Sequence, residues 1–91
     1  MKTNIQSIHF DASEQLQAFI EKKTAKLERF FDEIDTVEVT LKVVKPETAM
    51  NKQADVKVVV KNENLFASKI CDTFEESIDQ CVDALRIQLE K

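Results

Sequence analysis

The 91-residue sequence contains no glycine, one proline, one histidine and two cysteines. Phosphate-binding loops and nucleophile elbows need backbone close to a ligand or at positive φ, where glycine is the usual residue. No such loop can be written in this chain. The single histidine, His9, has no cysteine or serine motif nearby, and a surface or sheet-edge position suits it better than the role of a catalytic base. We therefore expect neither an enzyme nor a cofactor or metal site.

Long apolar runs are absent as well. No segment approaches about 18 consecutive apolar residues, so no membrane-spanning helix is expected, and the N-terminus lacks the continuous apolar stretch of a signal peptide. These features predict a cytoplasmic protein whose cysteines, Cys71 and Cys81, stay reduced. Their spacing matches no zinc motif, so both are interpreted as small apolar side chains. We expect Cys81 to be buried and Cys71, at a strand–helix junction, to be more accessible.

Residues 1–91 are predicted to form a single domain, because a chain of this length has room for one core. Hydrophobic residues make up 43% and charged residues 33% of the sequence, which is typical of an ordinary globular protein. Strict alternation or short apolar runs predict strands at 3–9, 36–44, 54–60 and 65–70. Apolar residues at three- and four-residue spacing predict helices at about 12–32 and from about 73 to the C-terminus. Capping boxes of Asp11 with Glu14 and of Thr73 with Glu76 are expected to open these helices.

The resulting order, β-α-β-β-β-α, predicts the arrangement of the sheet. A strand–helix–strand unit favours a right-handed crossover and a parallel first pair, whereas the meander that follows is antiparallel. Each amphipathic helix has one apolar face, and one face of a sheet can cover both. The predicted fold is thus an α+β two-layer sandwich, with a four-stranded mixed sheet and two helices on one face.

Charge is distributed unevenly along the chain. The sequence has 13 Lys and Arg against 17 Asp and Glu, yet "EKKTAKLERFFDEI" at 21–34 gathers four cations within eight positions. On a helix these cations cluster on one side, which we call the basic ridge: Lys22, Lys23, Lys26 and Arg29. Lys23 falls at the border of the apolar stripe, where its stem can pack and its ammonium can reach solvent. A neighbouring sector, the acidic ridge, holds Glu14, Glu21, Glu28 and Asp32.

Two interpretations of the basic ridge stay open. Like charges at i,i+4, such as Lys22 with Lys26, each cost about 0.2–0.5 kcal/mol, so a helix selected only for stability would interleave its charges. The ridge is either a solvated face with accidental clustering or a surface for an anionic partner, in particular phosphates. Lys42 and Lys45 extend the positive surface if they lie nearby. The outer face of the last helix is acidic and is interpreted as a solvated face; it holds Glu75, Glu76, Asp79, Asp83 and Glu90.

Several segments together resemble the short ribosome hibernation-promoting factors, the ribosome-associated translation inhibitor family. The similar segments are "NI" at 4–5, "AKLERFFDEI" at 25–34, "VEVTLKV" at 37–43, "LFASK" at 65–69, and "SID…L…QLEK" ending at Lys91. The resemblance covers nearly the whole chain. It implies a fold similar to a double-stranded RNA-binding domain with an added first strand. It also implies a bacterial stress-response protein without cofactor, which binds the small ribosomal subunit and blocks its mRNA and tRNA sites.

The resemblance further implies contacts to ribosomal RNA from basic side chains on both helices. Carried over by position, Lys23, Lys26 and Arg29 match the first-helix set, with Lys22 adjacent. The other candidate cations complete the expected RNA-binding residues: Lys42, Lys45, Arg86 and Lys91. The chain departs from the family pattern at Ala84 and Ile87, where basic residues are frequent, and at Thr24, where an aromatic residue or leucine is usual. No C-terminal domain of the kind that pairs ribosomes is expected within these residues.

A second hypothesis belongs to another class of protein. A small interaction module would use the acidic helix face or the open face of the sheet to bind a partner or to dimerise. The open face is predicted to carry Glu38, Thr40, Lys42, Val44, Asp55, Lys57, Val59 and Lys61. Such a mixed composition is also what a solvated sheet face shows.

Overall fold

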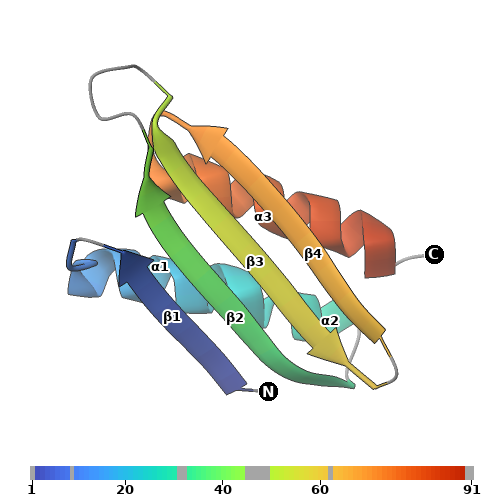
Figure 1. Ribbon diagram of the computed structural model, residues 1–91. Coiled ribbons are helices and arrows are strands. Elements are labelled where there is room, and N and C mark those ends of the chain that lie inside the picture. Colours follow the sequence, from blue (N-terminus) through green and yellow to red (C-terminus); the bar gives the residue numbers. More distant parts are fainter. Residues whose placement is uncertain (1, 9, 31–32, 45–49, 62, 90–91) are drawn as a thin grey trace.

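The computed structural model describes residues 2–8, 10–30, 33–44, 50–61 and 63–89. In chain order the elements are β1 (Lys2–Ile8), α1 (Glu14–Ala25), α2 (Leu27–Phe30), β2 (Ile34–Val43), β3 (Lys52–Val60), β4 (Glu63–Cys71) and α3 (Phe74–Leu89). The strands form one sheet in the order β1-β2-β3-β4 (Figure 1). β1 pairs with β2 in parallel, and the two following pairs are antiparallel.

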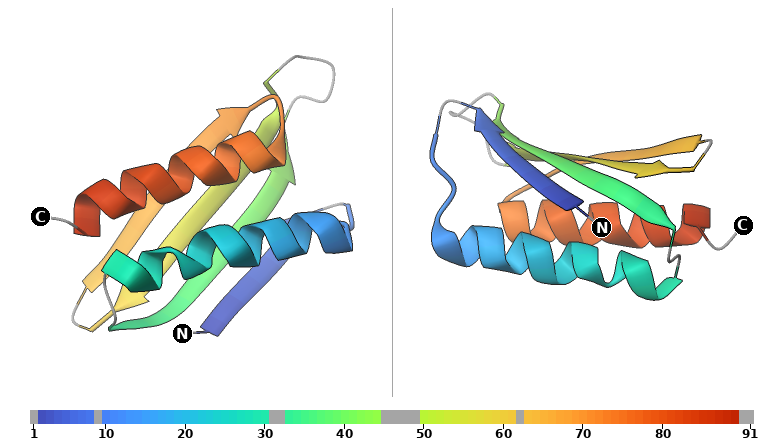
Figure 2. Two further views of the ribbon diagram at one scale, coloured as in Figure 1. Left: turned by 180° about the vertical axis from the view of Figure 1, so that it is seen from behind. Right: turned by 90° about the horizontal axis from the view of Figure 1, so that it is seen from below.

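The helices lie side by side on one face of the sheet and leave the other face open (Figure 2). This arrangement confirms the predicted two-layer α+β sandwich, including the parallel first pair that the crossover rule requires. Because α1 and α3 run in the same direction, the same edge of the helix layer carries both of their N-terminal ends (Figure 2).

The core lies between the two layers. Alternate side chains of β2 and β3 face the helices and are buried: Val37, Val39, Leu41, Ala54, Val56 and Val58. Ile20 and Leu27 close the core from the first helical segment, and Ile78 and Leu85 close it from α3. Each buried valine, leucine or isoleucine among them contributes about 1.5–3 kcal/mol relative to an exposed position. The apolar residues that alternate along the strands thus pack against those of the helical stripes in one core.

The first helical segment is not the continuous helix that the periodicity predicts. Lys26 lies in a turn between α1 and α2, and its N–H donates to the carbonyl of Lys23 at 3.2 Å. The N–H of Arg29 likewise donates to the carbonyl three residues earlier, that of Lys26, at 3.1 Å. Thr24 is buried, and its hydroxyl donates a hydrogen bond to the carbonyl oxygen of Ile20 at 2.9 Å. Back-bonding of this kind bends helices, so we attribute the break to Thr24.

The N-terminal caps agree with the sequence in one helix and differ in the other. α1 is capped by Ser13, whose Oγ accepts from the N–H of Leu16 at 3.0 Å, so the prediction of Asp11 was wrong. Phe10 anchors the incoming chain, because its ring stacks on Phe74 with centroids 5.0 Å apart. At α3 the Thr73 half of the predicted capping box is confirmed, since the N–H of Glu76 donates to Thr73 Oγ1 at 3.1 Å.

β4 is longer than predicted, and this places Cys71 inside the sheet. The residue pairs with Lys52 across the β3–β4 ladder and is only 3% exposed. Cys71 is therefore buried instead of accessible, although it keeps slightly more exposure than Cys81, at 3% against 0%. Cys81 is buried as expected, and both thiols are free. His9 and Glu90, for which the sequence gives predictions, lie outside the described part of the chain.

Candidate nucleic-acid interface

The exposed side of the first helical segment carries most of the predicted basic ridge. α1 buries Leu16, Ile20 and Thr24 against the sheet. Lys22, Lys26 and Arg29 are exposed. With 100° per residue, the two lysines lie on the side opposite the buried stripe, and α2 continues that side at Arg29. The break at Lys26 does not separate them, because the turn keeps the helical direction (Figure 2).

Lys23 differs from the other members of the ridge. Its side chain is only 23% exposed, and its Nζ lies 2.9 Å from Oδ1 of Asp79 on α3. The ammonium is also 5.5 Å from the centre of the Phe19 ring. The hydrogen bond to Asp79 raises the pKa of Lys23 above its ordinary value, and the charge of Asp83 acts in the same direction. Lys23 therefore joins α1 to α3 instead of projecting freely from the ridge.

The acidic ridge lies on the other flank of α1. Glu14, Glu21 and Glu28 are exposed, whereas Asp32 falls outside the described residues. Lys23 marks the flank that faces α3, and Glu21 lies about 200° from it around the helix axis. The acidic ridge consequently points away from α3, toward the β1 side of the molecule.

α3 presents carboxylates next to the basic ridge. It buries Ile78, Cys81 and Leu85, among others, on the sheet. The opposite side is exposed, and three of its residues, which we call the α3 carboxylates, are Glu76, Asp79 and Asp83. Glu75, in the first turn, is exposed as well. The outer surface of the helix layer is thus basic over α1 and acidic over α3.

The C-terminal half of α3 holds Ala84 and Ile87, two of the three positions at which the sequence is expected to depart from the pattern of the family that it resembles. Ala84 is half-buried against the core, and Ile87 is exposed at 52%. Arg86 is half-buried. It lies two turns beyond Asp79 and therefore on the same side of the helix, the side that faces the first helical segment. Arg86 is the one predicted cation of α3 within the described residues.

The remaining predicted cations do not join the ridge. Lys42 is exposed on β2 next to buried Leu41, so alternation places it on the open face, with the whole sheet between it and the helices. The condition under which it would extend the ridge is not met. Lys45 and Lys91 lie outside the described residues.

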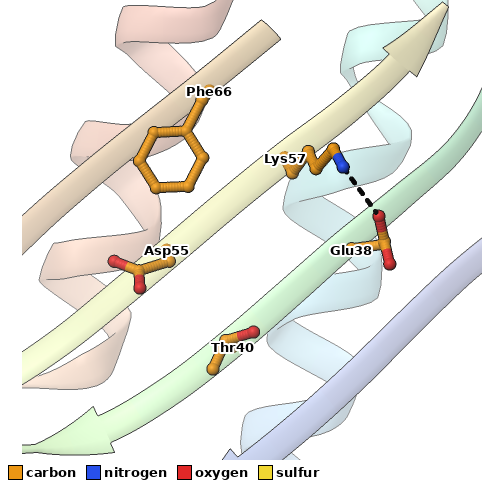
Figure 3. Close-up of a pocket in the computed structure, with 5 residues that line it drawn as sticks. All are labelled: Glu38, Thr40, Asp55, Lys57 and Phe66. Carbon is orange, nitrogen blue, oxygen red and sulfur yellow. Dashed lines mark ion pairs between the residues drawn. The ribbon is translucent and has the colours of Figure 1, made fainter. Parts of the chain in front are cut away.

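The open face carries a hollow lined by Glu38, Thr40, Asp55, Lys57 and Phe66 (Figure 3). Its volume of about 220 Å³ lies below the roughly 300–1,000 Å³ of small-molecule sites. Lys57 Nζ is 3.9 Å from Oε2 of Glu38, and the carboxylate of Asp55 accepts hydrogen bonds from the side chains of Gln53 and Ser68. These polar groups mostly satisfy one another.

Two apolar residues of this face were missed from the sequence. Phe66 is 57% and Ile70 is 44% exposed, both on edge strand β4. Alternation with Leu65 and Ala67, which face the helices, was the signal that could have placed them there. Of the predicted open-face residues, those within strands lie on this face, whereas Val44 and Lys61 follow the ends of β2 and β3.

Within the described ranges, no group of three or more His, Cys, Asp or Glu side chains is placed to hold a metal ion. None of the helices formed by these residues is long and apolar enough to cross a membrane.

Comparison with known proteins decides the family. The family model described as "Sigma 54 modulation protein / S30EA ribosomal protein" matches residues 3–91. The chain belongs to this family. It is 34% identical over 91 residues to the ribosome hibernation promoting factor of Escherichia coli (strain K12), an alignment that covers all of this chain and 92% of that protein. The factor of the same name from Pseudomonas putida is 26% identical over 91 residues, which cover 85% of its length.

Two solved structures have the same fold as this chain. A ribosomal subunit interface protein from Coxiella burnetii superposes with a TM-score of 0.87 at 22% identity, over 98% of this chain and 93% of its own. The N-terminal domain of Thermus thermophilus Protein Y superposes with a TM-score of 0.84 at 20% identity, over 99% and 97%. The resemblance to the hibernation-factor family and the predicted two-layer α+β fold are confirmed. The similarity to a double-stranded RNA-binding domain stays a prediction. The names of the relatives describe ribosome hibernation, not an enzyme, in agreement with the expectation that this chain is not one.

Proposed function

We propose that this protein is a ribosome hibernation factor that binds the RNA of the small ribosomal subunit through its basic ridge and blocks the mRNA and tRNA sites. Family membership and the names of the relatives support association with the ribosome. The observation that carries the choice of surface is the row formed by Lys22, Lys26 and Arg29. These side chains are exposed together on the side of the helical segment opposite the core.

The proposed mechanism uses binding alone. Each ridge cation that neutralises a phosphate releases condensed counterion, which favours association without any sequence-specific contact. The body of the protein, 39 × 24 × 19 Å, then excludes mRNA or tRNA from the space that it occupies. Net charge does not oppose this, because the local potential of the ridge governs the contact and the overall charge of −4 mainly limits nonspecific association.

Salt dependence is the direct test of this mechanism. If Lys22, Lys26 and Arg29 each neutralise one phosphate, log K falls with log salt with a slope of about −2.1 to −2.7. Raising salt from about 50 to about 200 mM then weakens binding about 20- to 40-fold. Co-sedimentation of the protein with purified small subunits over this range measures the slope. Absence of co-sedimentation at low salt, or binding that salt does not weaken, would overturn the proposal.

The domain and its location follow from the same proposal. One sheet, one core and one candidate interface suit a single ribosome-binding domain, which would act in the cytoplasm where ribosomes are. The chain would hold single ribosomes inactive and would not by itself join two of them. Sucrose-gradient sedimentation of idle ribosomes with the protein as the sole addition checks this, and a new peak of paired ribosomes would contradict it.

A further inference from the structure

The helix layer places opposite charges side by side. Lys22, Lys26 and Arg29 are exposed on the outer side of α1 and α2, and the α3 carboxylates are exposed on the outer side of α3. The two helices pack next to each other and run in the same direction (Figure 2). Neighbouring helices are typically about 8–10 Å apart, which is comparable to the screening length of about 8 Å at physiological ionic strength. A phosphate bound along α1 is therefore within reach of the charge on α3.

Lys23 makes this coupling direct. Asp79 Oδ1 lies 2.9 Å from Lys23 Nζ, the position that a phosphate oxygen would take in a charge-assisted hydrogen bond. Asp83, one turn further along α3, also favours the charged form of Lys23. A phosphate that approaches Lys23 competes with Asp79 for the ammonium and lies close to both carboxylates.

We infer that Asp79 and Asp83, with Glu76, determine how nucleic acid is bound: Asp79 occupies Lys23 in place of a phosphate, and the three carboxylates repel any backbone that would extend from α1 onto α3. This inference rests on the proposed function. Its consequence is one-sided binding, in which a phosphate backbone follows α1 and α2 and turns away from α3. The carboxylates lower the affinity for nucleic acid in general and select sites whose backbone fits one helix.

The test compares two variants with the same change in net charge. Asp79→Asn releases Lys23, and Glu38→Gln removes a carboxylate from the open face on the other side of the sheet. The probe is a plain RNA duplex of non-ribosomal sequence, and the measurement is its affinity at several salt concentrations. For Asp79→Asn we expect an affinity about two- to fivefold higher, from the loss of a screened repulsion. The salt slope should also steepen by about 0.7–0.9, because Lys23 gains a phosphate.

A second pair of variants does not involve the ion pair. Asp83→Lys adds a cation beside the ridge, and Glu38→Lys adds one on the open face. Asp83→Lys should bind the duplex more tightly than Glu38→Lys, with a steeper salt slope. Because Asp83 is exposed and lies off the buried stripe, this pair stays informative even if Asp79→Asn changes helix packing. Circular dichroism confirms that each variant is folded.

The outcomes separate the inference from the function on which it rests. If the α3 variants bind the duplex no better than their Glu38 counterparts, the inference is wrong, whether or not the unmodified protein binds ribosomes. If the α3 variants do bind better while the unmodified protein fails to co-sediment with small subunits, the charge coupling stands and the proposed function fails.

Discussion

Lys23 on α1 and Asp79 on α3 form an ion pair that joins the two helices of the layer, with 2.9 Å between Nζ and Oδ1. Lys23 lies at the edge of the apolar stripe, and its ammonium is 5.5 Å from the Phe19 ring. It is therefore a structural contact as much as a surface charge. The other three cations of the ridge are exposed, so the four residues that sequence groups together are not equivalent.

This difference predicts unequal effects of removing single charges. Lys26→Gln should weaken small-subunit binding and flatten the salt slope by about 0.7–0.9, because one phosphate contact is lost. Lys23→Gln should leave the slope nearly unchanged and should lower the melting temperature slightly, because α1 loses its ion pair to α3. Co-sedimentation at several salt concentrations and thermal unfolding followed by circular dichroism measure both. A slope reduced equally by the two variants would show that Lys23 leaves Asp79 to contact phosphate.

Substitution of Ser77 should change the free energy of unfolding without affecting ribosome binding. Its side chain is buried in α3, and its hydroxyl donates to the carbonyl oxygen of Lys52 on β3 at 2.6 Å. Ser77→Ala should lower the free energy of unfolding by about 1–2 kcal/mol, because the hydrogen bond is lost and a carbonyl is left without this donor. Urea unfolding measures the loss. Thr73→Ala, which removes a cap with a typical contribution of about 1 kcal/mol, is a matched comparison at the start of the same helix.

Much of the fold was predictable because the sequence shows two regular patterns of apolar residues, alternation in the strands and three- or four-residue spacing in the helices. Strict alternation in β2 and β3 placed Val37, Val39 and Leu41 on one side, and the structure buries them. The break at Lys26 was not predictable in this way, because it arises from the hydroxyl of Thr24 competing for backbone carbonyls within a periodic helix. The cap at Ser13 depends on how Phe10 packs, which is a tertiary contact.

The candidate interface was predictable only in part. Helical geometry alone groups Lys22, Lys26 and Arg29 on one exposed side. Helical geometry does not predict the ion pair of Lys23 with Asp79, because Asp79 lies on α3, which is far from α1 in the sequence and packs beside it only in the folded protein. The burial of Cys71 was not predicted, because the residue was expected at a strand–helix junction, whereas it is the last residue of β4 and faces the core.

The burial of Cys81 should make the stability of the fold depend on pH in the alkaline range. Burial raises the pKa of its thiol to about 12 from an ordinary value of 9.0, with the charge of Asp55 acting in the same direction. The folded state thus holds the proton where the unfolded state releases it, so this contribution to stability is complete below about pH 9 and is lost as pH rises toward about 12. Lys23, whose pKa is also raised, adds to the same alkaline loss.

Comparison with Cys81→Ala isolates the thiol. The variant should be less stable by about 1 kcal/mol near neutral pH, from a small loss of packing. Its free energy of unfolding should then fall less steeply than that of the unmodified protein between about pH 9 and about pH 10.5. Urea unfolding at several pH values gives both slopes, and parallel slopes would contradict the assignment. Ribosome binding by Cys81→Ala should be unchanged, since the side chain lies in the core.

Charge reversal on the basic and acidic ridges of the first helical segment is the strongest test of the interface. Reversing Lys26 and Arg29 to Glu should nearly abolish co-sedimentation with small subunits, because two favourable phosphate contacts become repulsions. Folding should be little affected, since both side chains are exposed and surface changes usually stay within about 0.5 kcal/mol. The matched variant reverses Glu21 and Glu28 to Lys on the opposite flank. It should bind as well as the unmodified protein or slightly more tightly.

The same two variants discriminate between the classes of function. A protein-interaction module that docks through the acidic ridge predicts the opposite ranking, with the Glu21 and Glu28 variant losing its partner and the Lys26 and Arg29 variant retaining it. A ridge that is only a solvated face predicts that the Lys26 and Arg29 variant co-sediments like the unmodified protein. Phosphate binding predicts neither result, because only the cations then face the partner, and their reversal changes the sign of each contact.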